Sequence, residues 1–146
     1  MLAVTAAALA CNIAAARATV KAERLTIPAS ASMSSSAFRA DPKLVDTVLC
    51  LPLPGGGTAL ALTIASGGTA GDTSWAIYVG SKLALVRGGY KLSIRRKGPD
   101  IVETDPVYRS KDPNCCPTGG FDHTQWHWNG TKFVVARTWH NKSYEP

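Results

Sequence analysis

The chain has 146 residues, of which 45% are hydrophobic and 18% charged, so it is long enough for one domain with a real core and too short for two. This composition excludes a largely disordered protein. The formal net charge of +6 favours anionic partners.

The first 22 residues are small and mostly apolar, with no charge before Arg17. The tripeptide Ala16-Arg17-Ala18 has the small residues that signal peptidase requires, so we predict an export signal over residues 1–18 and a periplasmic or secreted protein. The apolar run is shorter than the about 20 residues that span a bilayer. Two alternatives remain: a lipid anchor on Cys11, which follows Ala-Leu-Ala, and an alanine-rich surface helix of a cytosolic protein.

Residues 19–40 are rich in Ala and Ser with little periodicity, which predicts a flexible linker. The next segment begins with Asp41 and Pro42, which suit the N-cap and the first position of a helix. Apolar residues then recur at helical spacing. We therefore predict a short amphipathic helix over residues 41–50, ended by the sequence LPLPGGG.

From residue 58 onward, apolar residues alternate at a period of two in segments separated by glycine-rich turns. The clearest segments are TALALTIA, SWAIYVG and YKLSIRR. No helical segment separates them, which favours antiparallel pairing. We predict a mainly β (α+β) fold in one β-rich domain, residues 41–142. It would be an antiparallel meander sheet of about six to seven strands, with one short N-terminal helix packed on it.

A hairpin is predicted within residues 123–139, because Asn129-Gly130 is a residue pair that type I′ turns prefer. As a two-residue loop, it would pair Trp126 with Phe133 on a buried face and leave the histidines of this strand on the opposite face.

We expect no metal site and no cofactor. His123 and His127 would lie about 13 Å apart on a strand, too far for one ion. Cys115 and Cys116 are adjacent, without the spacer that zinc ligands usually have. The sequence has no serine-hydrolase, zinc-protease or phosphate-loop motif. We therefore expect a protein that is not an enzyme. The alternative is a small hydrolase that acts on a wall polymer or an ester. Its site would combine His123 with either Cys116 or an acid.

After removal of the signal, Cys50, Cys115 and Cys116 would remain, and an oxidising compartment would favour a disulfide among them. We expect Cys50 to bridge to Cys115 or Cys116. A bridge between Cys115 and Cys116, and a fully reduced chain, are the alternatives. The sequence DPNCCPTGG is interpreted as a constrained turn before a core strand, since its two prolines fix backbone angles.

Six basic residues and no acid lie between residues 82 and 97. In an exported protein such a cluster could meet an anionic envelope polymer, a lipid headgroup or another envelope protein, and we expect no nucleic-acid partner. The simpler interpretation is a set of solvated outer strand faces. The candidate ligand-binding residues are Arg87, Lys91, Arg95, Arg96 and Lys97.

The segment VYRSKDPNCCPTGGFDHTQWHWNGTKFV contains the motif D-P-x-C-C-P-S/T-G before a Trp-rich strand. It resembles small secreted bacterial proteins, and it is similar to the LppP/LprE-type lipoproteins, which join a helix to a compact antiparallel sheet. The resemblance covers residues 41–139 and implies no activity and no catalytic residues. Our hypothesis is therefore an exported, monomeric, non-enzymatic binding or inhibitor module.

Overall fold

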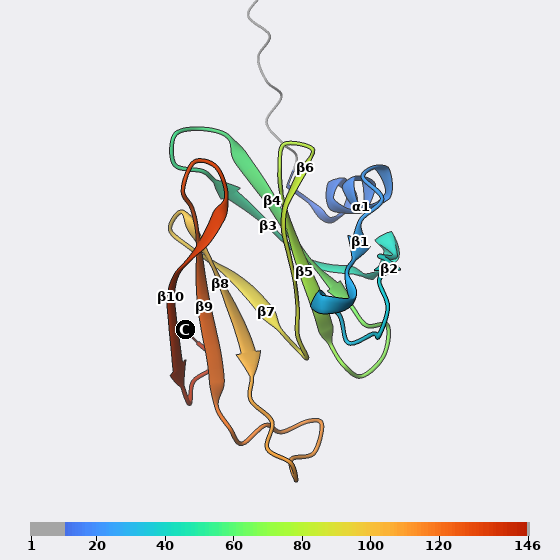
Figure 1. Cartoon of the computed structure of the whole chain (residues 1–146), viewed down its shortest axis with the longest axis vertical. Coiled ribbons are helices and arrows are strands. Elements are labelled where there is room, and N and C mark those ends of the chain that lie inside the picture. Colours follow the sequence, from blue (N-terminus) through green and yellow to red (C-terminus); the bar gives the residue numbers. More distant parts are fainter. Residues whose placement is uncertain (1–10, 146) are drawn as a thin grey trace, which may run out of the picture.

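The computed structural model describes residues 11–145 (Figure 1). Nearly half of these residues lie in antiparallel strands and only one α-helix is present among them, so the mainly β class predicted from the sequence is confirmed. The elements in chain order are α1 (Ile13–Ala22), β1 (Thr26–Ile27), η1 (Ala29–Ala31), β2 (Phe38–Arg39), η2 (Pro42–Leu44), β3 (Val45–Pro52), β4 (Thr58–Ala65), β5 (Asp72–Val79), β6 (Lys82–Gly88), β7 (Ser93–Lys97), β8 (Asp100–Pro106), β9 (Phe121–Trp128) and β10 (Phe133–Asn141).

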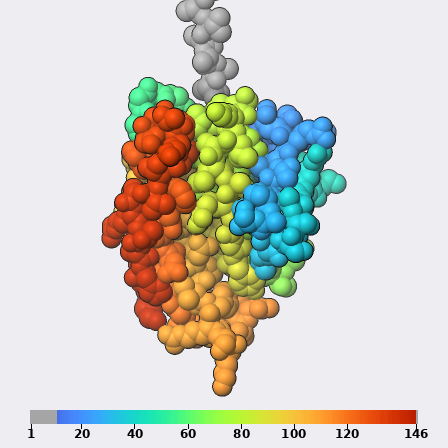
Figure 2. All heavy atoms as spheres, in the orientation of Figure 1, coloured from blue at the N-terminus to red at the C-terminus, as the bar shows by residue number. Residues whose placement is uncertain are grey.

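These elements form three layers. The middle layer is a four-stranded sheet with the order β3-β4-β5-β6, and a second sheet with the order β10-β9-β8-β7 packs on one of its faces. The helix α1 and the short β1-β2 sheet cover the other face, so that the middle sheet is buried on both sides (Figure 1). In Figure 2 the N-terminal segment (blue) packs directly against the strands of the middle sheet (green).

The core between the two large sheets is built by alternate residues of facing strands. Trp75 in β5 and Trp126 in β9 meet edge to face, with their ring centroids 6.5 Å apart. This is a preferred geometry for aromatic pairs. Ile77 and Ile101 are fully buried in the same core.

Two meanders of four strands replace the single sheet of six to seven strands that the sequence predicted. The chain leaves the middle sheet after β6, where Gly88 lies so close to the backbone of Ala31 that no Cβ would fit. Lys91 then adopts a left-handed backbone angle, φ +52°, before β7 begins in the facing sheet. A sandwich buries one apolar face of each sheet, which a single open sheet would leave exposed.

The N-terminal helix lies earlier in the chain than the sequence predicted. α1 begins after Asn12, whose side chain accepts a hydrogen bond from Ala15 N at 2.8 Å. Its Ala16 and Val20 are buried against the middle sheet. The predicted export signal ends inside this helix, and its residues 1–10 lie outside the described residues.

Packed structure takes the place of the flexible linker expected for residues 19–40. Leu25, Ile27 and Ala40 are 3% exposed or less and belong to the same core as α1. Leu25 and Ile27 alternate with polar residues over only one short stretch, and Ala40 stands alone between Arg39 and Asp41, so the sequence shows no sustained periodicity. They are ordered because the middle sheet has a second apolar face to cover.

The predicted helix over residues 41–50 is wrong beyond its first turn. Asp41 accepts a hydrogen bond from Lys43 N at 2.9 Å and Pro42 starts η2, as the sequence indicated. At Val45 the chain enters β3 and pairs with β4. Three β-branched residues in the first half of β3 favour a strand where a neighbouring strand can pair with it.

The β9-β10 hairpin is confirmed, but its loop has four residues rather than two. Trp128 pairs with Phe133, and Asn129 N donates to Lys132 O at 3.0 Å. The Asn129 side chain also accepts hydrogen bonds from two backbone N–H groups of the loop, which stabilises the longer turn. The pairing is displaced by two residues, an even number, so Trp126 stays on the buried face.

The predicted bridge from Cys50 to Cys115 or Cys116 is wrong. Cys50 is bonded to Cys11, which joins the start of α1 to β3, and Cys115 is bonded to Cys116. The prediction counted three cysteines because it assigned Cys11 to a removed signal. With Cys11 retained, the cysteines of the described chain pair completely.

Candidate functional site

The predicted basic cluster is divided among several environments. Arg87 turns into the sandwich and pairs with a buried glutamate, while Lys91 donates to a backbone carbonyl of a neighbouring loop. Arg96 is exposed and donates to a carbonyl of its own turn. Arg95 and Lys97 alternate with it on β7 and lie on the outer face of the β7–β10 sheet. Consecutive strand residues face opposite ways, so this sequence cannot form one patch.

On that outer face, β10 supplies a second cation and an aromatic ring. A bulge between Val135 and Arg137 places Arg137 and Trp139 opposite Gln125 and His123 of β9. Arg137 Cζ lies 4.5 Å from the centroid of the Trp139 ring, and Lys97 Nζ lies 5.6 Å from it.

We call Lys97, Arg137 and Trp139 the outer platform. Within residues 11–145, neither cation of the outer platform has a hydrogen bond or an ion pair, and both are exposed. Their charges are therefore held against one ring while their N–H donors face solvent. Such an arrangement suits an anionic group.

A buried histidine supports the platform from below. The His123 ring is stacked on Trp139 with centroids 5.1 Å apart, and the residue is 1% exposed. His123 Nε2 donates to Asn141 Oδ1 at 2.9 Å, and its Nδ1 accepts from Thr104 Oγ1 at 2.8 Å. Both ring nitrogens are therefore occupied, and this histidine orients Trp139.

A second cation and ring, Arg95 of β7 and Tyr144, lie together at the edge of the same sheet. Arg95 Cζ lies 4.6 Å from the Tyr144 ring, and the Arg95 guanidinium forms an ion pair with Glu145. The hydrogen bond to Glu145 raises the pKa of Arg95. Because this cation already has an acidic partner, it is less available to a ligand than those of the outer platform.

The interior of the sandwich holds a buried charge. Glu103 is fully buried and accepts hydrogen bonds from Trp75 Nε1 and from Arg87, whose Nη2 lies 3.0 Å from Glu103 Oε1. The Arg87 Cζ also lies 5.1 Å from the Trp126 ring. The hydrogen bond with Glu103 raises the pKa of Arg87. This network connects β5, β6, β8 and β9.

Further acids follow on the same inner face. Burial and the neighbouring Glu103 raise the pKa of Asp105 to about 7. Asp105 faces Asp122 across the β8-β9 ladder, and Asp122 Oδ1 accepts from His140 Nδ1 at 2.7 Å. Asp122 and His140 line a cavity of about 460 Å³ together with other residues of β9 and β10. Asp122 and His140 are exposed, so water solvates this pair.

The residues of the alternative hydrolase hypothesis do not come together. Cys116 is held in a disulfide within the loop between β8 and β9, whereas His123 is buried beneath Trp139 in the sheet. The ring nitrogens of His123 hydrogen-bond Thr104 and Asn141 rather than an acid, and the acid Asp100 accepts from His127 at 2.6 Å. Among residues 11–145, no group of three or more His, Cys, Asp and Glu side chains is arranged to hold a metal ion.

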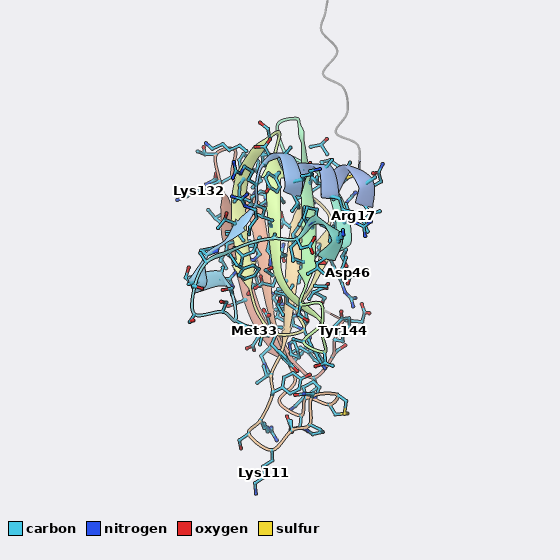
Figure 3. All side chains as sticks on the ribbon, turned by 90° about the vertical axis from the view of Figure 1, so that its right-hand side faces the viewer. Arg17, Met33, Asp46, Lys111, Lys132 and Tyr144 are labelled. Atoms are coloured by element: carbon cyan, nitrogen blue, oxygen red, sulfur yellow. A yellow bond between two sulfur atoms is a disulfide. The ribbon has the colours of Figure 1, made fainter. Side chains whose placement is uncertain are left out.

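The loop between β8 and β9 projects beyond the end of the sandwich. Figure 3 labels Lys111 at its far end, well away from the sheets. Asp112 orders this loop by accepting hydrogen bonds from Arg109 N at 2.7 Å and from Thr118 N and Oγ1, each at 2.8 Å. These bonds lower the pKa of Asp112. At the base, Val107 N donates to Gly120 O at 2.9 Å.

Arg137 was not among the predicted residues, because it lies 40 residues beyond the basic cluster and because regular pairing would have directed its side chain inward. The bulge after Val135 reverses that direction. The alternation of residues in 133–141 places Arg137 and Trp139 on the same face of the strand. It does not indicate that this is the outer face, because no residue type in the segment predicts the bulge.

Comparison of the chain with protein-family models, with curated proteins and with solved structures finds no match. In the described part of the chain, α1 is too short to cross a bilayer and no other helix has the necessary length and hydrophobicity.

Proposed function

We propose that the protein is an exported binding module that holds an anionic polymer of the cell envelope on the outer platform and performs no chemical step on it. The observation that carries this proposal is the pair of exposed cations, Lys97 and Arg137, held against Trp139 with no acidic partner in the described chain. Cations that are paired within a fold stabilise it, whereas cations held apart from acids are available for recognition.

Charge and rigidity both support this role. The chain carries a formal net charge of +6, which favours encounter with a polyanion. Trp139 is fixed by its stacking on His123. The ring against which both cations lie is therefore already ordered before a ligand binds, which lowers the entropic cost of binding. The two disulfides support an oxidising compartment outside the cytosol, where such bonds persist.

Retention on an immobilised carboxylate polymer tests the proposal, with polygalacturonate as the probe. The double variant Lys97→Gln, Arg137→Gln should bind about fivefold more weakly, since two solvent-exposed ion pairs contribute about 1 kcal/mol together. Binding of the unchanged protein should also weaken as salt is added.

The matched control is Lys21→Gln, Arg24→Gln, which removes the same net charge in and just after α1, on the opposite layer of the molecule. It should retain nearly full binding. Equal losses in both variants would show that only net charge matters and would contradict a site at the outer platform. Preference for single-stranded DNA over the carboxylate polymer would contradict the proposed class of ligand.

Arg95→Gln separates the platform from its neighbour on β7. Arg95 is already paired with Glu145, so its removal should weaken binding less than Arg137→Gln does. A larger effect of Arg95→Gln would place the ligand at the chain end instead.

A further inference from the structure

The projecting loop between β8 and β9 carries a disulfide at an unusual place. Cys115 and Cys116 are neighbours in the chain, are bonded to one another, and are both exposed. Figure 2 shows this segment (orange) extending below the body of the molecule. We call residues 107–120 the tip loop.

The bond does little for the stability of the fold. Disulfides stabilise mainly by closing long loops in the unfolded chain, and a bond between adjacent residues closes the shortest loop there is. The shape of the tip loop is already set by Asp112 and by the backbone bonds that join Val107 to Gly119 and Gly120. Tyr108 Oη also donates to Asn114 O at 2.8 Å. A structural purpose therefore does not account for this bond.

Exposure, adjacency in the chain and the charge of the loop favour attack on this bond by a thiolate. Because the two cysteines are adjacent, their Cα atoms have the 3.8 Å spacing of a trans peptide, closer than the separation that disulfides prefer, and a bond between neighbours is therefore easier to reduce. Arg109 and Lys111 are exposed in the same loop, and Lys91 contacts it by donating to Asn114 O. The one acid within 107–120, Asp112, keeps its negative charge because its three hydrogen bonds stabilise the carboxylate, so Arg109 and Lys111 leave the loop with a net charge of +1. Positive charge around a sulfur stabilises the thiolate that leaves.

We propose that the tip loop is a thiol–disulfide exchange site whose substrate is an accessible dithiol. One thiolate of the dithiol attacks Sγ of one cysteine, a new S–S bond forms, and the Cys115–Cys116 bond breaks with its electron pair passing to the other Sγ. The second thiolate of the dithiol attacks the mixed disulfide and releases the second cysteine. The dithiol leaves as a disulfide, and the tip loop gains two electrons and two protons.

Cys11–Cys50 provides an internal comparison. It joins residues 39 apart in the chain, and its ends are held by α1 and β3, so the folded structure favours its oxidised form. The two disulfides should therefore react at different rates in the folded protein.

Limited reduction of the folded full chain tests this inference. The protein is treated either with dithiothreitol or with a reduced Cys-X-X-Cys protein at the same dithiol concentration, then alkylated with iodoacetamide and mapped by mass spectrometry. Labels should appear on Cys115 and Cys116 while Cys11 and Cys50 stay unlabelled. Faster labelling with the protein dithiol would assign a protein substrate, and faster labelling with dithiothreitol a small one. The inference is overturned if labels appear on Cys11 and Cys50 at the same rate, or if the tip loop reacts only in denaturant.

Two variants separate chemistry from structure. Arg109→Gln, Lys111→Gln should slow reduction of the tip loop by about threefold, the size expected for exposed charges. Lys21→Gln, Arg24→Gln, with the same loss of charge in and just after α1, should not slow it. Equal rates in both variants would contradict stabilisation of the leaving thiolate. Cys115→Ser, Cys116→Ser should fold with an unchanged circular dichroism spectrum and lose all exchange; a loss of fold would instead identify the bond as structural.

Discussion

Arg87 in β6 and Glu103 in β8 join the two sheets of the sandwich through an ion pair with a separation of 3.0 Å between Nη2 and Oε1. The glutamate side chain is fully buried, whereas 40% of the arginine side chain is exposed. The guanidinium also lies over the ring of Trp126. The Arg87 side chain thus contacts the buried Glu103 and the Trp126 ring of the second sheet while it remains partly exposed to solvent.

Removal of the arginine should leave a buried carboxylate without its cation. We expect Arg87→Met to lower the free energy of unfolding by about 3 kcal/mol, because an unpaired buried charge costs far more than a surface ion pair contributes. Urea unfolding followed by tryptophan fluorescence measures this change.

Arg96→Met is the matched control for Arg87→Met, since Arg96 is exposed and contacts only its own turn. It should change the stability by less than about 0.5 kcal/mol. The double variant Arg87→Met, Glu103→Gln should recover part of the loss. Equal stabilities of Arg87→Met and Arg96→Met would contradict the role of the ion pair.

The stability of the protein should fall as the pH rises from about 4 to about 7. Burial and Glu103 raise the pKa of Asp105 from its ordinary 3.8 to about 7, so the folded state binds a proton that the unfolded state has released in this range. Burial and the nearby Asp46 raise the pKa of Asp72 to about 6, which acts in the same direction.

Asp105→Asn should therefore stabilise the protein at pH 8 by about 2 kcal/mol, a value that allows for the partial exposure of this side chain. At pH 4 the effect should nearly vanish, because Asp105 is then protonated in the folded state. The measurement is urea unfolding at both pH values. A substitution that is equally effective at the two pH values would show that Asp105 does not titrate in this range.

Loss of the bond between α1 and β3 should destabilise the whole domain. Cys11→Ser, Cys50→Ser opens a loop of 39 residues, for which the chain-entropy relation gives about 4 kcal/mol. Thermal unfolding should show a clear fall in Tm, whereas Cys115→Ser, Cys116→Ser should show almost none. An intact mass of the mature protein would also decide whether Cys11 is retained, because cleavage after residue 18 would remove it.

Alternation of apolar residues was sufficient to predict the antiparallel strands, since burial of one face of a sheet imposes a period of two. Pairing between distant segments was not predictable in the same way. The break between β6 and β7 depends on Lys91 adopting a left-handed angle that its residue type does not favour. The helix at residues 13–22 carries the composition of an export signal, and only its buried Ala16 and Val20 show that it packs.

The candidate site was harder to predict than the fold. The cluster of charges near residue 95 indicated a basic surface, but strand alternation divides it, and Arg137 comes from a strand at the other edge of the sheet. The disulfides were mispredicted for a related reason. Cys11 was excluded by its place in the chain, although the fold brings it to Cys50. Both errors concern contacts that arise only after the layers assemble.

The tip loop should lose its order when Asp112 is replaced, although the sandwich should not. Asp112→Ala removes the acceptor for Arg109 N and for both donors of Thr118. Hydrogen exchange of the amides in 107–120 should become several-fold faster, while the global free energy of unfolding stays nearly constant, since the loop lies outside both cores.

Asp41→Ala is the control for Asp112→Ala, because it removes a similar exposed acceptor at the start of η2 and should change exchange only near residue 43. Unchanged exchange in 107–120 after Asp112→Ala would show that another contact, such as the one from Tyr108 to Asn114, orders the loop. Amide exchange in the unchanged protein after reduction of the Cys115–Cys116 bond provides a second comparison. Since Asp112 rather than the disulfide is expected to set the backbone here, reduction should accelerate exchange less than Asp112→Ala does.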